Sequence, residues 1–278
     1  MSKNKTFNIV CWIFVVIFLM ITIFPFFWIL ISSFKPESEI FGANAYRIIA
    51  ENPTLENYRT VIVEKGMLRA IGNSFVMSAA TTFYVVIVAS MSAYIISRFK
   101  FKGKALLMGL ILAVAMFPQM IVVGPIFNMF YKLKILNTYW VCLAYSTITL
   151  PSAVWIMVAH FNQVPLALEE AAKIDGCSPF MVMTRIFLPV SSTGIAVAVI
   201  FAFTRTWNEF LFAFTFISTT EKKPIIVSLY EILKNNPAVG IPWHYVMAGA
   251  MYTTVPLVIL FICIRNYITG DHTAGAIK

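Results

Sequence analysis

The stretch IVCWIFVVIFLMITIFPFFWILI, Ile9 to Ile31, carries no charged residue and decides the fold class of this chain. A helix of about 20 apolar residues is long enough to cross the roughly 30 Å hydrocarbon core of a bilayer. The stretch is longer than the apolar region of a signal peptide, which is about 7–15 residues, and no A-x-A-like cleavage site follows it. We therefore expect an uncleaved first transmembrane helix.

The composition extends this conclusion to the whole chain. Of the 278 residues, 60% are hydrophobic and only 12% are charged, and the mean hydropathy is +0.83. A soluble domain of this length could not hide so much apolar surface from water. We predict an all-α integral membrane protein with six transmembrane helices, at Ile9–Ser33, Ile71–Ser97, Ala105–Tyr131, Thr138–Phe161, Pro189–Ile217 and Tyr245–Ile264.

Proline and glycine interrupt the third predicted span at Pro118, Gly124 and Pro125. Broken helices often line cavities in membrane proteins. Ordinary kinked packing would account for the same residues, so both interpretations stay open.

The formal net charge of +9 does not by itself distinguish a nucleic-acid-binding protein from a membrane protein. Basic residues of membrane proteins commonly lie at helix ends and face lipid headgroups. No basic face interleaved with aromatic residues is present, so we expect no nucleic-acid partner. The cysteines and histidines lack the spacing of a disulfide framework or a metal site, and we expect free thiols and no metal; they are Cys11, Cys142, Cys177, Cys263, His160, His244 and His272.

The predicted orientation of the chain in the membrane depends on one basic turn, RFKFKGK at Arg98–Lys104. A tally of the basic residues outside the spans, this turn included, does not favour either side of the membrane. Short loops near span ends carry the most weight in the positive-inside rule. This turn therefore predicts cytoplasmic N- and C-termini.

The loop between the fourth and fifth spans reads VPLALEEAAKIDGCSPFMVMTRIFLPV, Val164–Val190, and predicts two short helices joined by a turn. Pro165 can open the first helix, and Gly176 can end it because glycine adopts the left-handed cap conformation without a Cβ penalty. Ser178 and Pro179 have the residue types of a helix cap and first turn. The second helix would run to Leu188.

Seven residues of this loop resemble the EAA coupling motif of bacterial ABC importer permeases. At the motif's spacing they are Glu170, Ala171, Ala172, Gly176, Ile186, Leu188 and Pro189. The alternative is an ordinary amphipathic loop on the membrane surface, but chance seldom fills every position of such a motif.

The resemblance implies a cytoplasmic coupling helix that sits in a cleft of a separate ATPase. The implied coupling residues are Glu169, Glu170, Ala171, Ala172, Asp175, Gly176, Ile186, Leu188 and Pro189. Glu170 would pair with a basic residue of the ATPase, and Gly176 would permit the turn. No G-x-x-x-x-G-K-[ST] phosphate loop is present. The sequence has one Gly-Lys pair, Gly103-Lys104, and Arg98 occupies the position where the motif needs its first glycine. ATP and Mg²⁺ would therefore bind to the partner ATPase, and this chain would be neither an enzyme nor a cofactor carrier.

The wider sequence is similar to MalG-like permeases of carbohydrate uptake systems from about Phe24 to the C-terminus. The similar segments include FPFFWILISSFKPESEIF, MFPQMIVVGP, WNEFLFAFTF and GDHTAGAIK. The resemblance implies a bacterial plasma-membrane heterodimer with a MalF-like permease, two ATPase subunits, an extracytoplasmic solute-binding protein and a sugar substrate.

The same resemblance implies a division of the chain. Residues 1–69 would form the first span and an extracytoplasmic segment. Residues 70–268 would form the permease core, with the coupling loop at 164–190. Residues 269–278 would form a cytoplasmic tail that reaches toward the ATPases.

Intramembrane charges are costly and mark candidate functional residues. Arg205 and Glu209 are such charges in the fifth predicted span, and an i, i+4 spacing would place them on one helical face. With Trp207 and Asn208 they are the candidate translocation-path residues. A structural ion pair that fixes bundle packing is the equally open alternative.

Two other function classes compete with an ATP-driven importer. An ion-coupled secondary transporter would place acids in the membrane interior, and only Glu209 fits. An intramembrane enzyme would need a catalytic motif such as H-E-x-x-H or G-x-S-x-G, and neither is present. Oligosaccharides, single sugars and glycerol phosphate esters all remain open as the solute.

Overall fold

The computed structural model describes residues 5–41, 45–234 and 240–268, with no description of the side chains of residues 5, 6 and 268. All regular structure in these ranges is helical. The chain forms two compact units. Unit 1 comprises Met1–Leu68 and Leu229–Val255, and unit 2 comprises Arg69–Ser228 and Pro256–Lys278. The predicted division into 1–69, 70–268 and 269–278 stays a prediction, and its last segment lies outside the described residues.

Unit 1 begins with α1 (Lys5–Ser33), a single apolar helix that contains Pro25. Its membrane-length stretch, Phe7–Ser33, buries none of its apolar window against the described chain. Such a helix must turn its side chains to lipid or to another subunit. The remaining elements with residues in unit 1 are α2 (Glu37–Phe41), α3 (Glu56–Arg59), the π-helical turn η1 (Thr60–Glu64), the end of α13 (Ile225–Lys234) and the first half of α14 (Trp243–Ile268).

Buried polar side chains shape the connection that follows α1. Lys35 is only 1% exposed, and its ammonium donates to the carbonyl oxygens of Ala45 and Arg47 at 2.9 and 2.6 Å. The Glu39 carboxylate accepts from the backbone amides of Glu51 and Asn52, each at 2.9 Å. Because these groups are satisfied by backbone partners, the polar segment after α1 has a defined fold.

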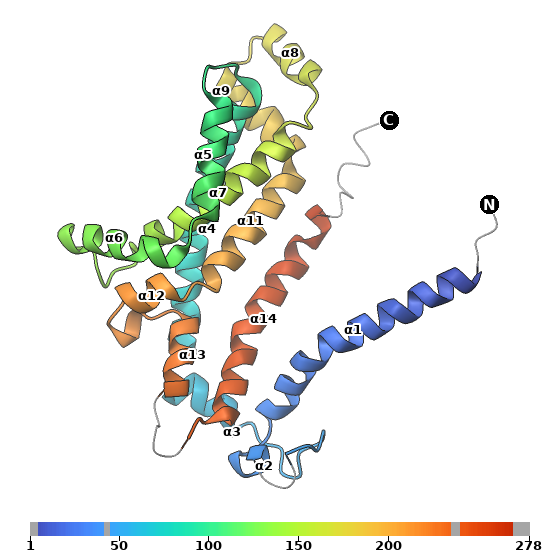
Figure 1. Ribbon diagram of the computed structural model, residues 1–278, viewed down its shortest axis with the longest axis vertical. Coiled ribbons are helices and arrows are strands. Elements are labelled where there is room, and N and C mark those ends of the chain that lie inside the picture. The colour runs from blue at the N-terminus through green and yellow to red at the C-terminus, as the bar shows by residue number, and fades with distance from the viewer. Residues whose placement is uncertain (1–4, 42–44, 235–239, 269–278) are drawn as a thin grey trace. The chain divides into compact units, whose positions relative to one another are not determined.

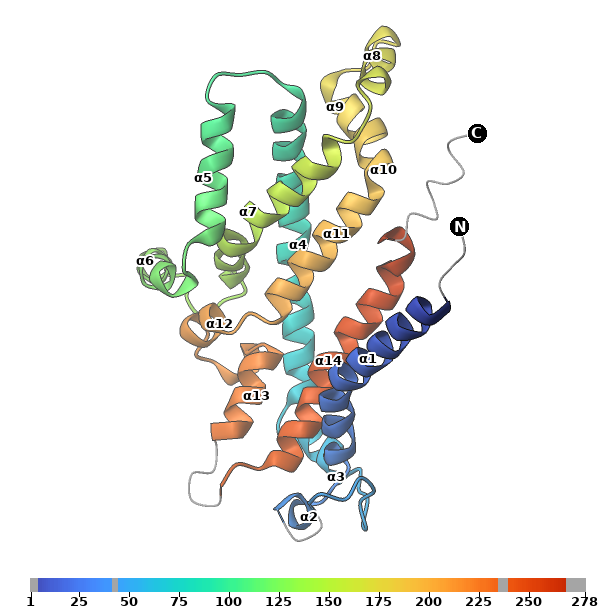
Figure 2. The ribbon, with the colours of Figure 1, turned by 45° about the vertical axis from the view of Figure 1, so that its right-hand side comes forward.

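Unit 2 is built on three long helices that pack through small residues. Both α7 and α11 contribute alanines to one core with α4, and Ala89, Ala153 and Ala202 are fully buried there. Small side chains let membrane helices approach closely. The elements of this unit are α4 (Met67–Arg98, its first two residues in unit 1), α5 (Lys104–Met116), α6 (Gln119–Lys132), α7 (Val141–Phe161), α8 (Leu166–Ile174), α9 (Pro179–Val182), η2 (Met183–Phe187), α10 (Leu188–Val190), α11 (Ser192–Trp207), α12 (Leu211–Phe216) and η3 (Thr220–Lys222), followed by the start of α13 and the end of α14 (Figures 1 and 2).

The contact between α7 and α11 requires glycine at one position. A Cβ on Gly194 would lie 2.5 Å from Cγ of His160, which is closer than real Cβ atoms approach. The absence of a side chain at Gly194 therefore lets the first turns of α11 cross α7 at this point.

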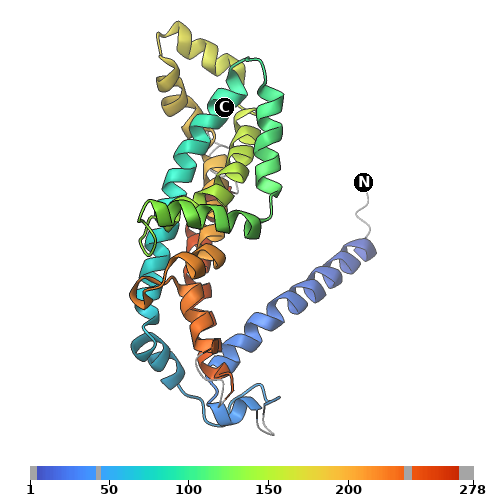
Figure 3. The ribbon, with the colours of Figure 1, turned by 60° about the vertical axis from the view of Figure 1, so that its left-hand side comes forward.

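Four helices among the described residues, α1, α4, α7 and α14, are long and apolar enough to cross a membrane. Two further spans are possible if each of two bent pairs counts as one: α5 with α6, bent by 95°, and the helix Pro179–Val190 with α11, bent by 81°. Figure 3 shows α6 running across the direction of α5.

The third predicted span, Ala105–Tyr131, is interrupted at Pro118, as its sequence predicts. Helix α5 ends at Met116, and Phe117 adopts an extended conformation. The residue before a proline is driven away from helical geometry, and Pro118 itself lacks a backbone donor. The fifth predicted span, Pro189–Ile217, is also interrupted, because Pro189 precedes the 81° bend and α11 ends at Trp207.

Candidate functional site

The predicted coupling loop folds as two short helices with a glycine turn between them. Helix α8 begins after Pro165 and ends at Ile174. Gly176 has φ of +80°; its amide donates to the Lys173 carbonyl at 3.1 Å, and the Cys177 amide donates to the Ala172 carbonyl at 2.9 Å. This is the Schellman arrangement, in which a left-handed residue turns the chain back on the helix end. The prediction that Pro165 opens the first helix and that Gly176 ends it is confirmed.

The second helix of the loop begins as its sequence predicts. The Ser178 hydroxyl accepts from the Met181 amide at 3.3 Å, and Pro179 occupies the first turn. The helix continues through η2 and α10 to Val190. We use the name coupling segment for residues Val164–Val190, which lie at one end of unit 2 in Figure 1.

The predicted coupling residues divide between a buried face and an exposed face of the segment. Glu169 and Ala172 are buried, and Ile186 and Leu188 pack partly against the same core. The exposed predicted residues are Glu170, Ala171, Asp175, Gly176 and Pro189. Large apolar side chains share the exposed surface: Ile174 is 86% exposed, Phe180 66% and Leu166 56%.

The two consecutive glutamates of α8 have opposite environments. Glu170 is exposed, whereas Glu169 turns into the unit and is 4% exposed. One Glu169 oxygen lies 2.7 Å from the Lys173 ammonium, and the other lies 3.6 Å from Nε of Arg98. The buried acid is therefore balanced by two cations.

The Glu169 hydrogen bond raises the pKa of Lys173 above its ordinary value. Stabilisation by this pair is consequently complete below the ordinary lysine pKa and is lost as pH rises through the raised value. The pair is thus intact at neutral pH.

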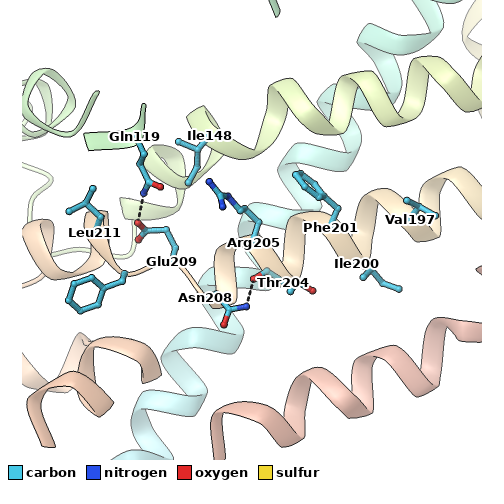
Figure 4. Close-up of a pocket in the computed structure, with 11 residues that line it drawn as sticks. Gln119, Ile148, Val197, Ile200, Phe201, Thr204, Arg205, Asn208, Glu209 and Leu211 are labelled. Atoms are coloured by element: carbon cyan, nitrogen blue, oxygen red, sulfur yellow. Dashed lines mark hydrogen bonds between the residues drawn. The ribbon is translucent and has the colours of Figure 1, made fainter. Parts of the chain in front are cut away.

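A second polar site lies where α11 ends. A pocket of about 710 Å³ has apolar walls from α7 and α11 and a polar edge formed by Gln119, Thr204, Arg205, Asn208 and Glu209 (Figure 4). The Asn208 side-chain amide donates to the Thr204 carbonyl at 2.9 Å. The arrangement offers both hydrogen-bonding groups and apolar surface to an occupant.

Glu209 serves as a helix cap in this pocket. Its carboxylate accepts from the backbone amides of Phe212 and Ala213 at 2.9 and 3.1 Å, at the start of α12. It also accepts from Nε2 of Gln119 at 2.7 Å, which ties the start of α6 to α12. Negative charge at a helix N-terminus is favourable.

The predicted helical face shared by Arg205 and Glu209 is not formed, because α11 ends at Trp207 and Glu209 lies in the break that follows. No ion pair joins the two within the part of the chain that the structure describes. Trp207, also a candidate path residue, is 2% exposed and stacks on Phe203 at 5.7 Å. The pocket therefore brings together Arg205, Asn208 and Glu209 but leaves Trp207 in the core.

Sequence reasoning missed Arg98 and Gln119 as site residues. Arg98 was assigned only to the basic turn that orients the chain, although its position at the end of a predicted span is also where an arginine can cap neighbouring carbonyls. Gln119 follows the break at Pro118, where a polar side chain in an apolar stretch is itself a signal. Among the described residues no cluster of acids, histidines and cysteines could hold a metal ion.

Comparisons with known proteins agree with the architecture. The model of the family described as binding-protein-dependent transport system inner membrane component matches residues 85–269. The trehalose/maltose transport permease MalG of Thermococcus litoralis is 34% identical over 263 residues, covering 93% of this chain and 92% of that protein. The trehalose transport permease SugB of Mycobacterium tuberculosis is 31% identical over 257 residues, covering 91% and 92%.

Solved structures show the same fold. A chain of a bacterial ABC transporter involved in import of the acidic polysaccharide alginate superposes with a TM-score of 0.78 at 16% identity, covering 96% of this chain and 98% of that one. A chain of the alginate transporter in complex with an alginate pentasaccharide-bound periplasmic protein has a TM-score of 0.69 at 14% identity, covering 98% and 96%.

Proposed function

We propose, from the premise that this chain belongs to the family of binding-protein-dependent transport system inner membrane components, that it is the permease subunit of an ATP-driven carbohydrate importer. Members of this family are multi-pass membrane components of transporters and are not themselves enzymes. The relatives named above carry trehalose or maltose, and another, from Halalkalibacterium halodurans, is an arabinooligosaccharide permease. An oligosaccharide or a related sugar is the solute we propose for this chain.

The observation that carries the proposal is the exposed face of the coupling segment. Ile174, Phe180 and Leu166 are large apolar side chains that the described chain leaves uncovered. Beside them, Ala171 is small enough for another protein to approach the backbone, and Glu170 supplies a negative charge. An apolar patch with a charged edge is typical of a protein interface. We propose that a separate ATPase subunit covers this face.

The proposed assembly follows from the same membership. Two permeases, this chain and a MalF-like partner, would each contact one ATPase, and an extracytoplasmic binding protein would deliver the solute. Each bent helix pair would serve as one span, giving six spans with cytoplasmic N- and C-termini and the Arg98–Lys104 turn on the cytoplasmic side. ATP and Mg²⁺ would bind to the ATPases.

The pocket beside α11 is the proposed contact surface for the solute or the partner permease. Arg205 and Asn208 are exposed there and can donate hydrogen bonds to hydroxyl-rich molecules. Glu209 is occupied as the cap of α12, which gives no support to the alternative of an ion-coupled secondary transporter that uses this acid as its coupling group.

The test is uptake by the purified complex in proteoliposomes, with ATP on the coupling-segment side and the loaded binding protein on the other. We expect uptake of labelled maltose or trehalose that requires ATP and persists without any ion gradient. Uptake driven by an ion gradient alone would refute the proposal.

One substitution tests the proposed docking face. Ile174→Glu places a charge in the centre of the exposed apolar surface and should abolish ATPase binding and uptake, whereas the matched control Ile174→Leu should retain both. Full uptake by Ile174→Glu would show that the ATPase does not bind there.

A further inference from the structure

Arg98, the last residue of α4, contacts the end of α7, where the coupling segment begins, and two residues within the segment. Its Nη2 donates to the carbonyl oxygens of Phe161, at 2.9 Å, and of Val164. Phe161 is the last residue of α7, and the carbonyls at a helix end lack partners within the helix. Arg98 therefore joins the ends of α4 and α7 at the point where the coupling segment begins.

The same guanidinium reaches the first helix of the coupling segment. Its Nε lies 3.6 Å from Oε2 of Glu169, and the two side chains are 10% and 5% exposed. Neither of these two buried atoms makes a hydrogen bond to a described residue. Charges buried this deeply are kept in place by one another, because either one alone would be strongly unfavourable.

The second helix of the coupling segment is contacted as well. The Arg98 guanidinium carbon lies 4.5 Å from the centroid of the Phe187 ring, in η2. A planar guanidinium can stack on a ring while its edges donate hydrogen bonds, and a lysine ammonium cannot do both. One side chain thus touches both halves of the coupling segment.

We infer that Arg98 is the positioning residue of the coupling segment: through Glu169 and Phe187 it holds the segment against the ends of α4 and α7, so that Glu170 and Ile174 face the ATPase. This inference rests on the proposed function. It assigns different roles to two adjacent acids, since Glu169 acts inside the permease and Glu170 acts at the interface. Neighbouring residues on a helix point in directions about 100° apart, which is why both roles fit in one turn.

A double-mutant cycle separates these roles. In the reconstituted complex, uptake per assembled complex is measured for Arg98→Ala, Glu169→Gln, Glu170→Gln and the two pairs that include Arg98→Ala. We expect the fold loss of uptake in the Arg98→Ala/Glu169→Gln double variant to be about tenfold smaller than the product of the fold losses in the two single variants, because both changes break the same contact. In the Arg98→Ala/Glu170→Gln double variant, the fold loss of uptake should equal the product of the fold losses in the two single variants. Independent effects of Arg98 and Glu169 would overturn the inference.

Two further variants separate positioning from simple loss of charge. Arg98→Lys keeps the positive charge but loses the fork and the ring stacking, and it should lose most of the uptake. Lys100→Ala removes an exposed basic residue of the same turn and should behave like the parent. Parental uptake by Arg98→Lys would overturn the inference.

A structural measurement keeps the inference testable apart from transport. Spin labels at Lys104, the first residue of α5, and at Arg185, an exposed residue of η2 that is not part of the proposed docking face, report the distance to the coupling segment in the full complex, with the native cysteines replaced by serine. Arg98→Ala should broaden the distance distribution, whereas Lys100→Ala should leave it narrow. An unchanged distribution in Arg98→Ala would refute positioning. A parent complex without ATP-dependent uptake would instead refute the proposed function and leave this measurement valid.

Discussion

Two buried glutamates, Glu169 in the coupling segment and Glu209 beside the pocket, are stabilised in different ways. Their exposed fractions are almost equal, 4% and 5%. Glu169 lies between two cationic side chains, Arg98 and Lys173. Glu209 has only neutral donors among the partners described above: two backbone amides of α12 and the Gln119 side chain.

The difference concerns what each acid holds in place. Glu169 joins parts of the chain that are far apart in sequence, and its loss leaves buried cations without a counter-charge. Glu209 closes the start of a short helix, and its loss leaves backbone donors without acceptors. Equal burial of the same residue type therefore accompanies a tether made of ion pairs in one region and, in the other, a helix cap with one hydrogen bond to the distant Gln119.

The largest effect is expected from Glu169→Gln. Removing the charge leaves the Arg98 guanidinium buried without its counter-ion, which costs about 3–5 kcal/mol when one partner of a buried pair is lost. The thermal midpoint of the purified complex should fall clearly, and uptake should fall with it. A thermal midpoint equal to that of the parent would show that burial of Arg98 and Lys173 does not depend on the negative charge of Glu169.

Glu209→Ala should have the next largest effect. It leaves the amides of Phe212 and Ala213 without their acceptor, at a cost of about 1–3 kcal/mol. Glu209→Gln keeps one acceptor oxygen and should recover part of the lost stability, measured by the same thermal midpoint. If Glu209→Gln abolishes uptake in a complex of parental stability, the acid acts in the translocation path and not as a cap.

Gly176→Ala tests the turn of the coupling segment and should cost about 1 kcal/mol, because an alanine is strained at φ of +80°. The matched control is Gly109→Ala in α5, where a Cβ would meet no atom within 4 Å and alanine is the better helix former. The control should be neutral or stabilising in the same thermal measurement. Equal effects of the two changes would contradict the role of the left-handed turn.

Arg205→Ala should have the smallest effect on stability, within about 0.5 kcal/mol, because the side chain is exposed and pairs with no acid among the described residues. Uptake should nevertheless fall if the pocket lines the solute path. A large loss of stability would reveal a structural partner outside this chain, such as the second permease.

Local patterns in the sequence predicted local structure well. Ser178 and Gly176 act as the cap and the turn that their residue types indicate, because both depend on backbone geometry within a few residues. Apolar length alone identified α1, α4, α7 and α14. The proline at Pro118 also indicated the break between α5 and α6. The break after Trp207 was not predicted, since an interrupted apolar run has the same composition as a straight span.

The amino-acid sequence by itself determined a multi-pass helical membrane protein with two short helices joined by a turn at Val164–Val190, because hydrophobic length and short-range motifs are properties of neighbouring residues. Only the tertiary structure decided which charges meet. It paired Glu169 with Arg98, not Arg205 with Glu209, because a buried charge takes the counter-charge that packing brings near it. Sequence spacing measures that proximity only along an unbroken helix.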